Sequence, residues 1–323
     1  MSIPLFDAHC DTLSRNYSPS HPYYGGGSLR RNSGHVDLER AHAAFGKYAQ
    51  FFAVFGTWNS RDRCEGDSLY PKFREQYVLF RRTMEENAYL VSPCRTAEEA
   101  ERANAAGKVA AFLSVEGAEL LDCDLEKLRR AHGLGVRAVN LTWNFQNALS
   151  GSNLAGADRG LTPRGRDFVR EMERLGMLVD VSHLSDPGFW DVAGLVQGPI
   201  VASHSNSRAL YFHPRNLTDG QFTAIMEHQG VVGLNMAAQF LGDDPTLDDL
   251  VRVLERFLDL GGENTVALGG DWDGIEKAPA GVRDVTAWSL FYQRLKGLGY
   301  GQALLDKIFY KNWMRVVEQV CTM

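Results

Sequence analysis

Leu178-Val-Asp-Val-Ser-His183 and, with its histidine 21 residues further on, Val201-Ala-Ser-His204 are the two stretches that decide the fold. Each is rich in small and branched apolar residues, which is typical of a strand buried on both faces, and each ends at a histidine. The segment between them, 185–196, predicts a helix with a Ser or Asp N-cap and Pro187 in its first turn. A strand–helix–strand unit of this length predicts parallel neighbouring strands, so both imidazoles should emerge at one edge of the sheet.

The same pattern extends over the whole chain and predicts the fold class. Buried strands are expected at residues 4–10, 47–56, 109–115, 136–142, 177–182, 199–203, 231–236 and 265–268. Eight strands, most of them followed by a helix, predict an α/β protein with a (β/α)8 TIM-type barrel, formed by a single domain over residues 1–323. An open doubly wound sheet is the alternative, but no GxGxxG or P-loop glycine motif follows the first strand.

Helical periodicity and turn residues predict the connecting segments. Helices are expected at 68–89, 96–106, 125–132, 162–176, 185–196, 219–228, 246–260, 286–298 and 302–320. Two polar segments without a period, 17–33 and 143–160, predict loops. The first is long for a structureless connection inside a compact domain, which indicates a functional lid.

Bulk composition narrows the class of protein. The 323 residues include 34 basic and 40 acidic side chains, and the absence of a long basic run argues against nucleic acid as the main partner. The N-terminal segment has no signal-peptide pattern, and no apolar run approaches the length of a membrane span. The five scattered cysteines have no CxxC spacing, so they indicate neither a zinc knuckle nor a disulfide framework. A reducing cytoplasm is the expected location.

Metal-ligating residue types stand at the ends of the predicted strands, where a (β/α)8 barrel has its active site. They are His9, Asp11, Glu116, His183, His204 and Asp271. This mixture of nitrogen and oxygen ligands suits zinc, with Mn, Co or Ni as alternatives. There are too many ligands for one tetrahedral ion with an open position, so two ions that share a carboxylate fit better. Such a pair can generate a hydroxide at neutral pH and clamp the oxygens of a hydrolytic transition state.

Each of these residues also has a purely structural interpretation. A His-x-Asp pair is common by chance, Glu116 could cap a helix, and Asp271-Trp-Asp273-Gly274 could be a turn in which only one Asp needs a function. Cys10, between His9 and Asp11, should point to the other side of its strand and pack there. The remaining histidines are expected at the surface: His21, His35, His42, His132, His213 and His228.

Taken together, the motifs resemble those of a known family. They are Asp7-Ala-His9-Cys-Asp11, Val36-Asp-Leu, Ser114-Val-Glu116-Gly117, Asp180-Val-Ser-His183, Ser203-His204-Ser-Asn, Arg215-Asn216, Gly270-Asp271-Trp-Asp273-Gly274 and Asn312. In this order they resemble the membrane (renal-type) dipeptidase family of metallopeptidases, within the amidohydrolase-like barrels. The resemblance spans nearly the whole chain, and the combination is specific although no single motif is.

The resemblance implies a binuclear zinc site. In it, His9 and Asp11 hold one ion. His183 and His204 hold the other, and Glu116 bridges the two. Members of the family cleave dipeptides, often with a D-residue at the C-terminal side, by attack of a metal-bridging hydroxide.

The resemblance also implies roles for residues that are not ligands. Arg215 would contact the substrate, and Asp271 would move a proton from the bridging water to the leaving amine. The family commonly has a histidine in a Leu-Thr-His segment after strand four that stabilises the oxyanion, whereas this chain has Trp143. The indole N–H is a single neutral donor in a different place, and the large ring would form a wall for a hydrophobic side chain. Asn144 would be the substitute donor to the substrate, but on an extended segment it is expected to point the other way.

Three hypotheses follow. The first is a dinuclear zinc dipeptidase. The second is an amidohydrolase that acts on N-acyl amino acids, lactams or lactones in a pocket reshaped by Trp143 and the loop 17–33. The third is a metal-dependent binding or scaffold protein, which the complete ligand set and Asp271 disfavour. The motifs do not distinguish among dipeptides, nor a monomer from a homodimer.

Overall fold

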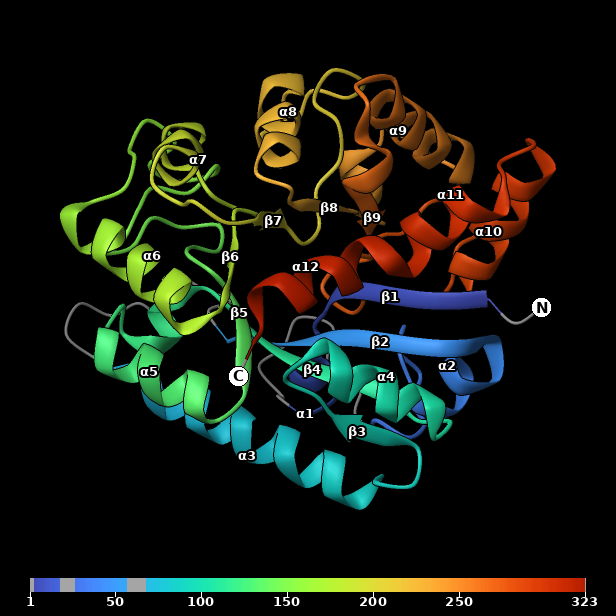
Figure 1. Ribbon diagram of the computed structural model, residues 1–323, viewed down its shortest axis with the longest axis horizontal. Helices are drawn as coiled ribbons and strands as arrows, with labels where there is room; N and C mark the ends of the chain where they lie inside the picture. Colours follow the sequence, from blue (N-terminus) through green and yellow to red (C-terminus); the bar gives the residue numbers. More distant parts are fainter. Residues whose placement is uncertain (1–2, 18–26, 57–67, 323) are drawn as a thin grey trace.

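A closed ring of eight parallel strands forms the centre of the computed structural model, which describes residues 3–17, 27–56 and 68–322 (Figure 1). The strands are β1 (Ile3–Cys10), β2 (Phe45–Val54), β4 (Val109–Glu116), β5 (Val136–Asn140), β6 (Leu178–Asp180), β7 (Ile200–Ala202), β8 (Val231–Leu234) and β9 (Val266–Leu268). Each pairs with the next, and β9 pairs with β1 at Leu268 and Asp7, which closes the ring. The predicted (β/α)8 barrel is confirmed.

A short additional strand, β3 (Val91–Pro93), was not expected. It pairs with the first half of β4, from Val109 to Ala111, on the edge where β5 pairs only from Leu113 onward. A three-residue strand that ends in proline lacks the run of alternating or apolar residues from which strands are predicted.

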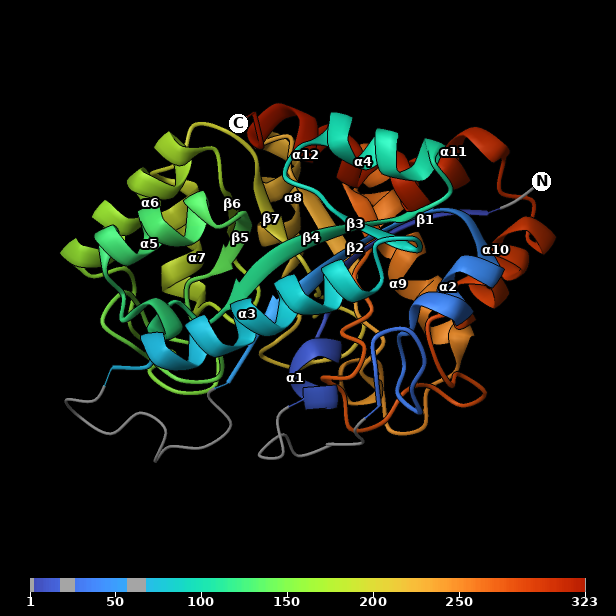
Figure 2. The same cartoon turned by 90° about the horizontal axis from the view of Figure 1, so that it is seen from below.

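Helices surround the ring and connect its strands (Figures 1 and 2). The α-helices are α1 (Thr12–Tyr17), α2 (Leu38–Ala44), α3 (Tyr70–Glu86), α4 (Ala97–Ala105), α5 (Leu125–Gly133), α6 (Pro163–Leu175), α7 (Asp186–Ala193), α8 (Asp219–Glu227), α9 (Leu247–Asp259), α10 (Ala287–Gly297), α11 (Gln302–Asp306) and α12 (Asn312–Val320). Short 3-10 turns lie at Ala118–Leu121, Ala238–Phe240 and Gly262–Asn264. None of the helices in the described ranges has both the length and the apolarity to cross a membrane.

Every predicted helix is present. Two short helices, α1 and α2, were not predicted; they precede and follow the expected loop 17–33, of which residues 18–26 lie outside the described part. The helix expected at 302–320 is two helices, because a π-helical turn, Lys307–Lys311, separates α11 from α12. Three consecutive residues of that turn, Ile308, Phe309 and Tyr310, are buried, which one face of a regular α-helix cannot achieve.

The core has two layers that follow the alternation of the strands. One apolar cluster fills the ring, with Phe6, Phe51 and Phe112 stacked on one another and Trp313 of α12 packed beneath them. Figure 2 shows α12 and α4 at this end of the barrel and α1 at the opposite end, toward which the strands run. The second cluster lies between strands and helices and includes Cys10, as expected. The C-terminal ends of the strands therefore lie above a barrel interior that is filled with apolar side chains.

Candidate metal centre

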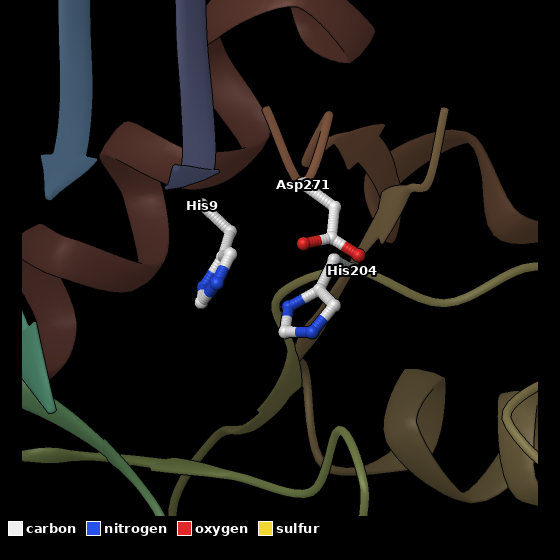
Figure 3. Close-up of side chains that lie close together, drawn as sticks. All are labelled: His9, His204 and Asp271. Atoms are coloured by element: carbon white, nitrogen blue, oxygen red, sulfur yellow. The ribbon is translucent and has the colours of Figure 1, made fainter. Parts of the chain in front are cut away.

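Five polar side chains converge at the C-terminal end of the barrel. His9 is the penultimate residue of β1, and Asp11 follows that strand. Glu116 ends β4, and His183 and His204 lie just beyond β6 and β7. All five are buried, and Figure 3 shows His9 and His204 pointing toward each other beside Asp271.

The carboxylate of Glu116 lies at the centre of this cluster. Its Oε2 is 3.5 Å from Nε2 of His9, which is itself 3.6 Å from Oδ2 of Asp11. Its Oε1 lies 2.9 Å from Nε2 of His183 and 3.7 Å from Nε2 of His204. The two oxygens of Glu116 thus face two different sets of ligand atoms.

The donor set fits divalent cations. Within the described residues, Nε2 of His9 and Oδ1 of Asp11 are buried and have no hydrogen-bond partner, although buried polar atoms nearly always have one. Nε2 of His183 lies only 3.0 Å from Nε2 of His204. Burial lowers the pKa of both imidazoles well below the usual value, so both are neutral and have lone pairs to offer. Imidazole nitrogens with carboxylate oxygens are a typical zinc donor set.

Burial also acts on the charged members of the cluster. It raises the pKa of Glu116 to about 7 and that of Asp271 to about 6. For His9, burial lowers the pKa, but the carboxylates of Glu116 and Asp11 outweigh it and raise the pKa well above the usual value. The raised pKa values of Glu116 and Asp271 come first from the cost of burying a carboxylate and to a lesser extent from the neighbouring carboxylate of Asp11, and a nearby cation would offset both.

Asn144 contacts the imidazole of His183 at Nδ1, the ring nitrogen that does not face Glu116. This Nδ1 lies 2.9 Å from Oδ1 of Asn144, an oxygen that can only accept, so Nδ1 donates and Nε2 keeps its lone pair for a metal. The prediction that Asn144 points away from the site is therefore wrong. The segment after β5 turns back toward His183, and strict alternation does not apply beyond the end of the strand.

Backbone constraints place the two histidines side by side. His183 has a left-handed backbone with φ of 71°, which is uncommon for a residue other than glycine. Oδ1 of Asp180 accepts hydrogen bonds from the backbone N–H groups of Ser182 and Ser203, each at 3.0 Å. This carboxylate joins the end of β6 to the end of β7, and so sets the separation of His183 and His204.

The two aspartates of the loop after β9 differ in orientation. Asp271 faces the cluster, where its carboxylate lies with His9 and His204, and its Oδ2 accepts a 3.0 Å hydrogen bond from Asn235. Asp273 faces away from it and accepts hydrogen bonds from Thr12 Oγ1 at 2.6 Å and the backbone N–H of His35 at 2.7 Å. Asp273 is therefore a buried structural link and not an ordinary turn residue.

A cavity of about 210 Å³ opens onto the cluster. It is lined by Asp11, Phe55, Glu116, Trp143, Asn144, Leu154, His183, His213, Arg215, Gln239, Phe240, Asp271 and Gly274. The indole of Trp143 packs against Phe55 with ring centroids 5.0 Å apart and lies 6.4 Å from the ring of His183. A larger cavity of about 490 Å³ lies outside the barrel between α3 and β3, away from the polar cluster.

The structure brings together all the predicted site residues but also corrects two expectations. His213 lines the cavity, and His35 accepts a hydrogen bond from the backbone N–H of Asp273, so neither is an ordinary surface residue. His21 lies outside the described residues. Asn235 was not predicted, because it lies within an apolar run just beyond β8. The signal that could have identified it is its position at the end of a strand. The residues Leu154, Gln239 and Phe240 carry no local motif.

Comparison with known proteins agrees with this geometry. Residues 1–323 match the family model for membrane dipeptidase (peptidase family M19). The solved structure of a metallopeptidase from Rhodobacter sphaeroides, liganded with a phosphinate mimic of the dipeptide L-Ala-D-Ala, is similar with a TM-score of 0.85 and 30% identity, over 99% of this chain and 100% of that one. That of dipeptidase AC, a metallopeptidase of family M19, has a TM-score of 0.84 and 31% identity over 100% of both chains. Dipeptidase tcpJ of Claviceps purpurea is 30% identical over 298 residues, 89% of this chain and 70% of the relative.

The barrel, the buried cluster of ligand atoms and these relatives define a metal-dependent hydrolase. More narrowly, the chain belongs to the membrane dipeptidase family, peptidase family M19, and is a metallodipeptidase of that family.

Proposed function

We propose that the chain is a dinuclear zinc dipeptidase whose catalytic domain spans residues 1–323. The observation that carries the proposal is the orientation of Glu116, whose two oxygens face separate groups of ligand atoms. His9 and Asp11 would hold one zinc ion, and His183 and His204 the other. Glu116 would contact both.

Two zinc ions bound there would supply a nucleophilic water at neutral pH and polarise the carbonyl of the scissile peptide bond. The protein itself would manage the proton. Asn235 holds Oδ2 of Asp271, which leaves Oδ1 to hold a proton and deliver it to the leaving amine. A pKa raised by burial to about 6 suits a group that must both accept and release a proton near neutral pH.

Arg215 would bind the terminal carboxylate of the dipeptide. Its guanidinium is buried at the cavity, and within the described residues its only hydrogen bond is a 3.3 Å contact from Nη2 to the backbone oxygen of His204. No described carboxylate forms an ion pair with it. The carboxylates of Asp271, Glu116 and Asp180 act on this guanidinium only from a distance, and burial still lowers its pKa. A carboxylate on the substrate in direct contact would offset the cost of burying the cation.

Aromatic side chains would select the substrate. Trp143 and Phe55 form an apolar wall of the cavity, where the family commonly has a histidine. We expect this wall to favour a hydrophobic side chain. The Rhodobacter relative, which binds a mimic of L-Ala-D-Ala, supports a substrate with a D-residue at the C-terminal side.

Metal content and dipeptide hydrolysis, measured on the same preparation, test the proposal. Protein purified without chelator should hold about two zinc ions per chain and hydrolyse L-Ala-L-Ala or L-Ala-D-Ala. Glu116→Gln removes the shared charge and should hold fewer ions than the wild type. A ceiling of one ion per chain after zinc addition would remove the bridging role of Glu116. No hydrolysis of any dipeptide in a broad panel would contradict the assignment as a dipeptidase.

One observation favours a second candidate. Replacing the family histidine with Trp143 makes the cavity wall more apolar, which also suits the acyl group of an N-acyl amino acid. A parallel assay with N-acetyl amino acids, lactams and lactones separates the candidates, because the amidohydrolase hypothesis requires faster turnover of these than of dipeptides.

A further inference from the structure

His213 lies two residues before Arg215 and lines the same cavity. Its Nδ1 accepts a 3.1 Å hydrogen bond from the backbone N–H of Arg215, in the geometry of an Asx turn. Because a neutral imidazole carries one proton and Nδ1 accepts here, the proton must lie on Nε2. The ring therefore offers an N–H donor from its other nitrogen, which has no hydrogen bond to any residue in the described ranges.

The same aromatic ring supports both His213 and Arg215. The ring centroid of Phe240 lies 4.5 Å from the ring centroid of His213. The guanidinium carbon of Arg215 lies 5.5 Å from the same Phe240 centroid. Phe240 is buried and lines the cavity as well. A shared platform and the turn hydrogen bond hold the imidazole and the guanidinium in one fixed relation to each other.

We propose that His213 is a second residue that binds the substrate carboxylate, and that its Nε2–H donates to the group whose charge Arg215 neutralises. The inference rests on the proposed function, since it assumes a substrate with a free C-terminal carboxylate. It makes His213 a determinant of specificity for dipeptide acids over dipeptides with a blocked C-terminus. Arg215 supplies the charge, and His213 supplies a directional donor.

The electrostatic setting supports a neutral donor. Burial and the positive charges of Arg215 and Arg208 lower the pKa of His213 to about 4, so the imidazole is uncharged at neutral pH. A neutral N–H adds a hydrogen bond to a carboxylate without placing a second positive charge beside the buried guanidinium.

Two substitutions distinguish the proposed Nε2–H donor from the turn hydrogen bond that Nδ1 of His213 accepts. His213→Asn keeps an oxygen that can accept from the N–H of Arg215, as in an Asx turn, but has no atom at the position of Nε2. His213→Gln places an amide N–H group at about that distance and loses the turn acceptor. The substrates are L-Ala-D-Ala and its C-terminal amide, and the measured quantity is the ratio of kcat/KM for the acid to that for the amide.

We expect the acid-to-amide ratio to fall about tenfold or more in His213→Asn, mainly through a higher KM for the acid, because a hydrogen bond to a charged group is lost. His213→Gln should keep most of the ratio. Phe212→Ala is the matched control, since that neighbouring side chain is 85% exposed and does not line the cavity. An unchanged ratio in His213→Asn would overturn the proposal, and so would an equal loss on acid and amide, which would indicate a role in loop structure alone.

A second comparison covers the case in which His213→Asn does not fold. His213→Gln and His213→Met both lose the turn acceptor, but only the glutamine has a donor. A ratio retained by Gln and lost by Met supports the proposal, and equal ratios contradict it. Wild-type protein that neither cleaves dipeptides nor binds the phosphinate mimic of L-Ala-D-Ala would contradict the proposed function itself. A wild-type preference for the acid with no effect at position 213 would contradict only the present inference.

Discussion

Asn144 orients the imidazole of His183, one of the proposed metal ligands. Its Oδ1 accepts a hydrogen bond from Nδ1 of His183, and the hydroxyl of Thr142 donates to the backbone oxygen of the same histidine at 3.3 Å. Contacts of this kind fix the tautomer and the direction of a ligating ring, and their loss commonly weakens metal binding by one or two orders of magnitude. The segment after β5 therefore both lines the cavity and orients a member of the buried cluster.

Asn144→Ala should lower zinc affinity by about 10- to 100-fold, because the ring of His183 loses the acceptor that orients it. Competition with a chromogenic chelator measures this directly and does not depend on activity. Asn144→Asp, which keeps an acceptor oxygen, serves as the control and should stay close to the wild type. Equal affinities in Asn144→Ala and the wild type would show that the hydrogen bond does not matter for metal binding.

Asp271→Asn should leave the metal content unchanged and lose at least about 100-fold in kcat, since the amide cannot carry the proton. Asp273→Asn makes a useful contrast. Its carboxylate holds Thr12 and the backbone of His35, so that change should lower the unfolding temperature more than it lowers kcat. Turnover and thermal unfolding measured for both variants test the assignment, which fails if Asp271→Asn turns over at near the wild-type rate.

At the scale of elements, a buried carboxylate in β1 organises the loop that carries Asp271. Asp7 accepts hydrogen bonds from the backbone N–H of Gly270 at 2.9 Å and from the indoles of Trp272 and Trp288 at 2.8 and 2.6 Å. The backbone N–H of His9 donates to it as well, at 3.2 Å. One side chain thus connects β1, the loop after β9 and α10.

Asp7→Asn should destabilise the protein by about 1–3 kcal/mol, because all four partners are donors and the new amide NH2 group must face some of them. Urea unfolding at neutral pH measures the change. Asp167→Asn on α6, which removes an exposed ion pair with Arg170, is the control and should stay within about 0.5 kcal/mol of the wild type. If the two variants are equally stable, the carboxylate is not the link that the geometry indicates.

Glu171 on α6 provides a stability effect that depends on pH. Hydrogen bonds from Arg174, and then from Arg129, lower its pKa to about 2. A depressed pKa means that the stabilisation is present above the ordinary value of about 4.3 and is lost as the pH falls toward 2. Glu171→Gln should therefore cost about 0.5–1 kcal/mol at pH 7, with a smaller difference from the wild type at pH 3.5. Thermal unfolding at both values checks this, and a difference that grows on acidification would contradict it.

At the scale of the whole molecule, the barrel concentrates carboxylates and imidazoles from five strand ends in one buried site. An ion that binds only the folded state stabilises it in proportion to the logarithm of its concentration over Kd, by about 2.7 kcal/mol at 100 times Kd. Removing bound metal with a chelator should therefore lower the unfolding temperature by several degrees, and added zinc, the proposed metal, should restore it. A His183→Ala, His204→Ala double variant should respond much less, and a wild type that is indifferent to the chelator would contradict a buried metal site.

Much of this arrangement was predictable from local patterns. Apolar runs and N-cap residues identify the eight strands of the ring and the surrounding helices, since each pattern reflects contacts within one element or on one face of it. The strand-end rule for barrels then brings His9, Glu116, His183, His204 and Asp271 to one place. The three-residue β3 and the π-helical turn at Lys307–Lys311 escape such patterns, because neither has a period of its own.

What the amino-acid sequence determined alone is thus the barrel and the kinds of ligand at its rim. Only the tertiary structure decided which way Asn144 points, that Asp271 and not Asp273 faces the ligands, and that His213 shares a cavity with Arg215. The physical reason is that loops beyond strand ends have no repeating geometry. Their side-chain directions are set by hydrogen bonds to residues distant in the chain, such as the one between Asp273 and Thr12.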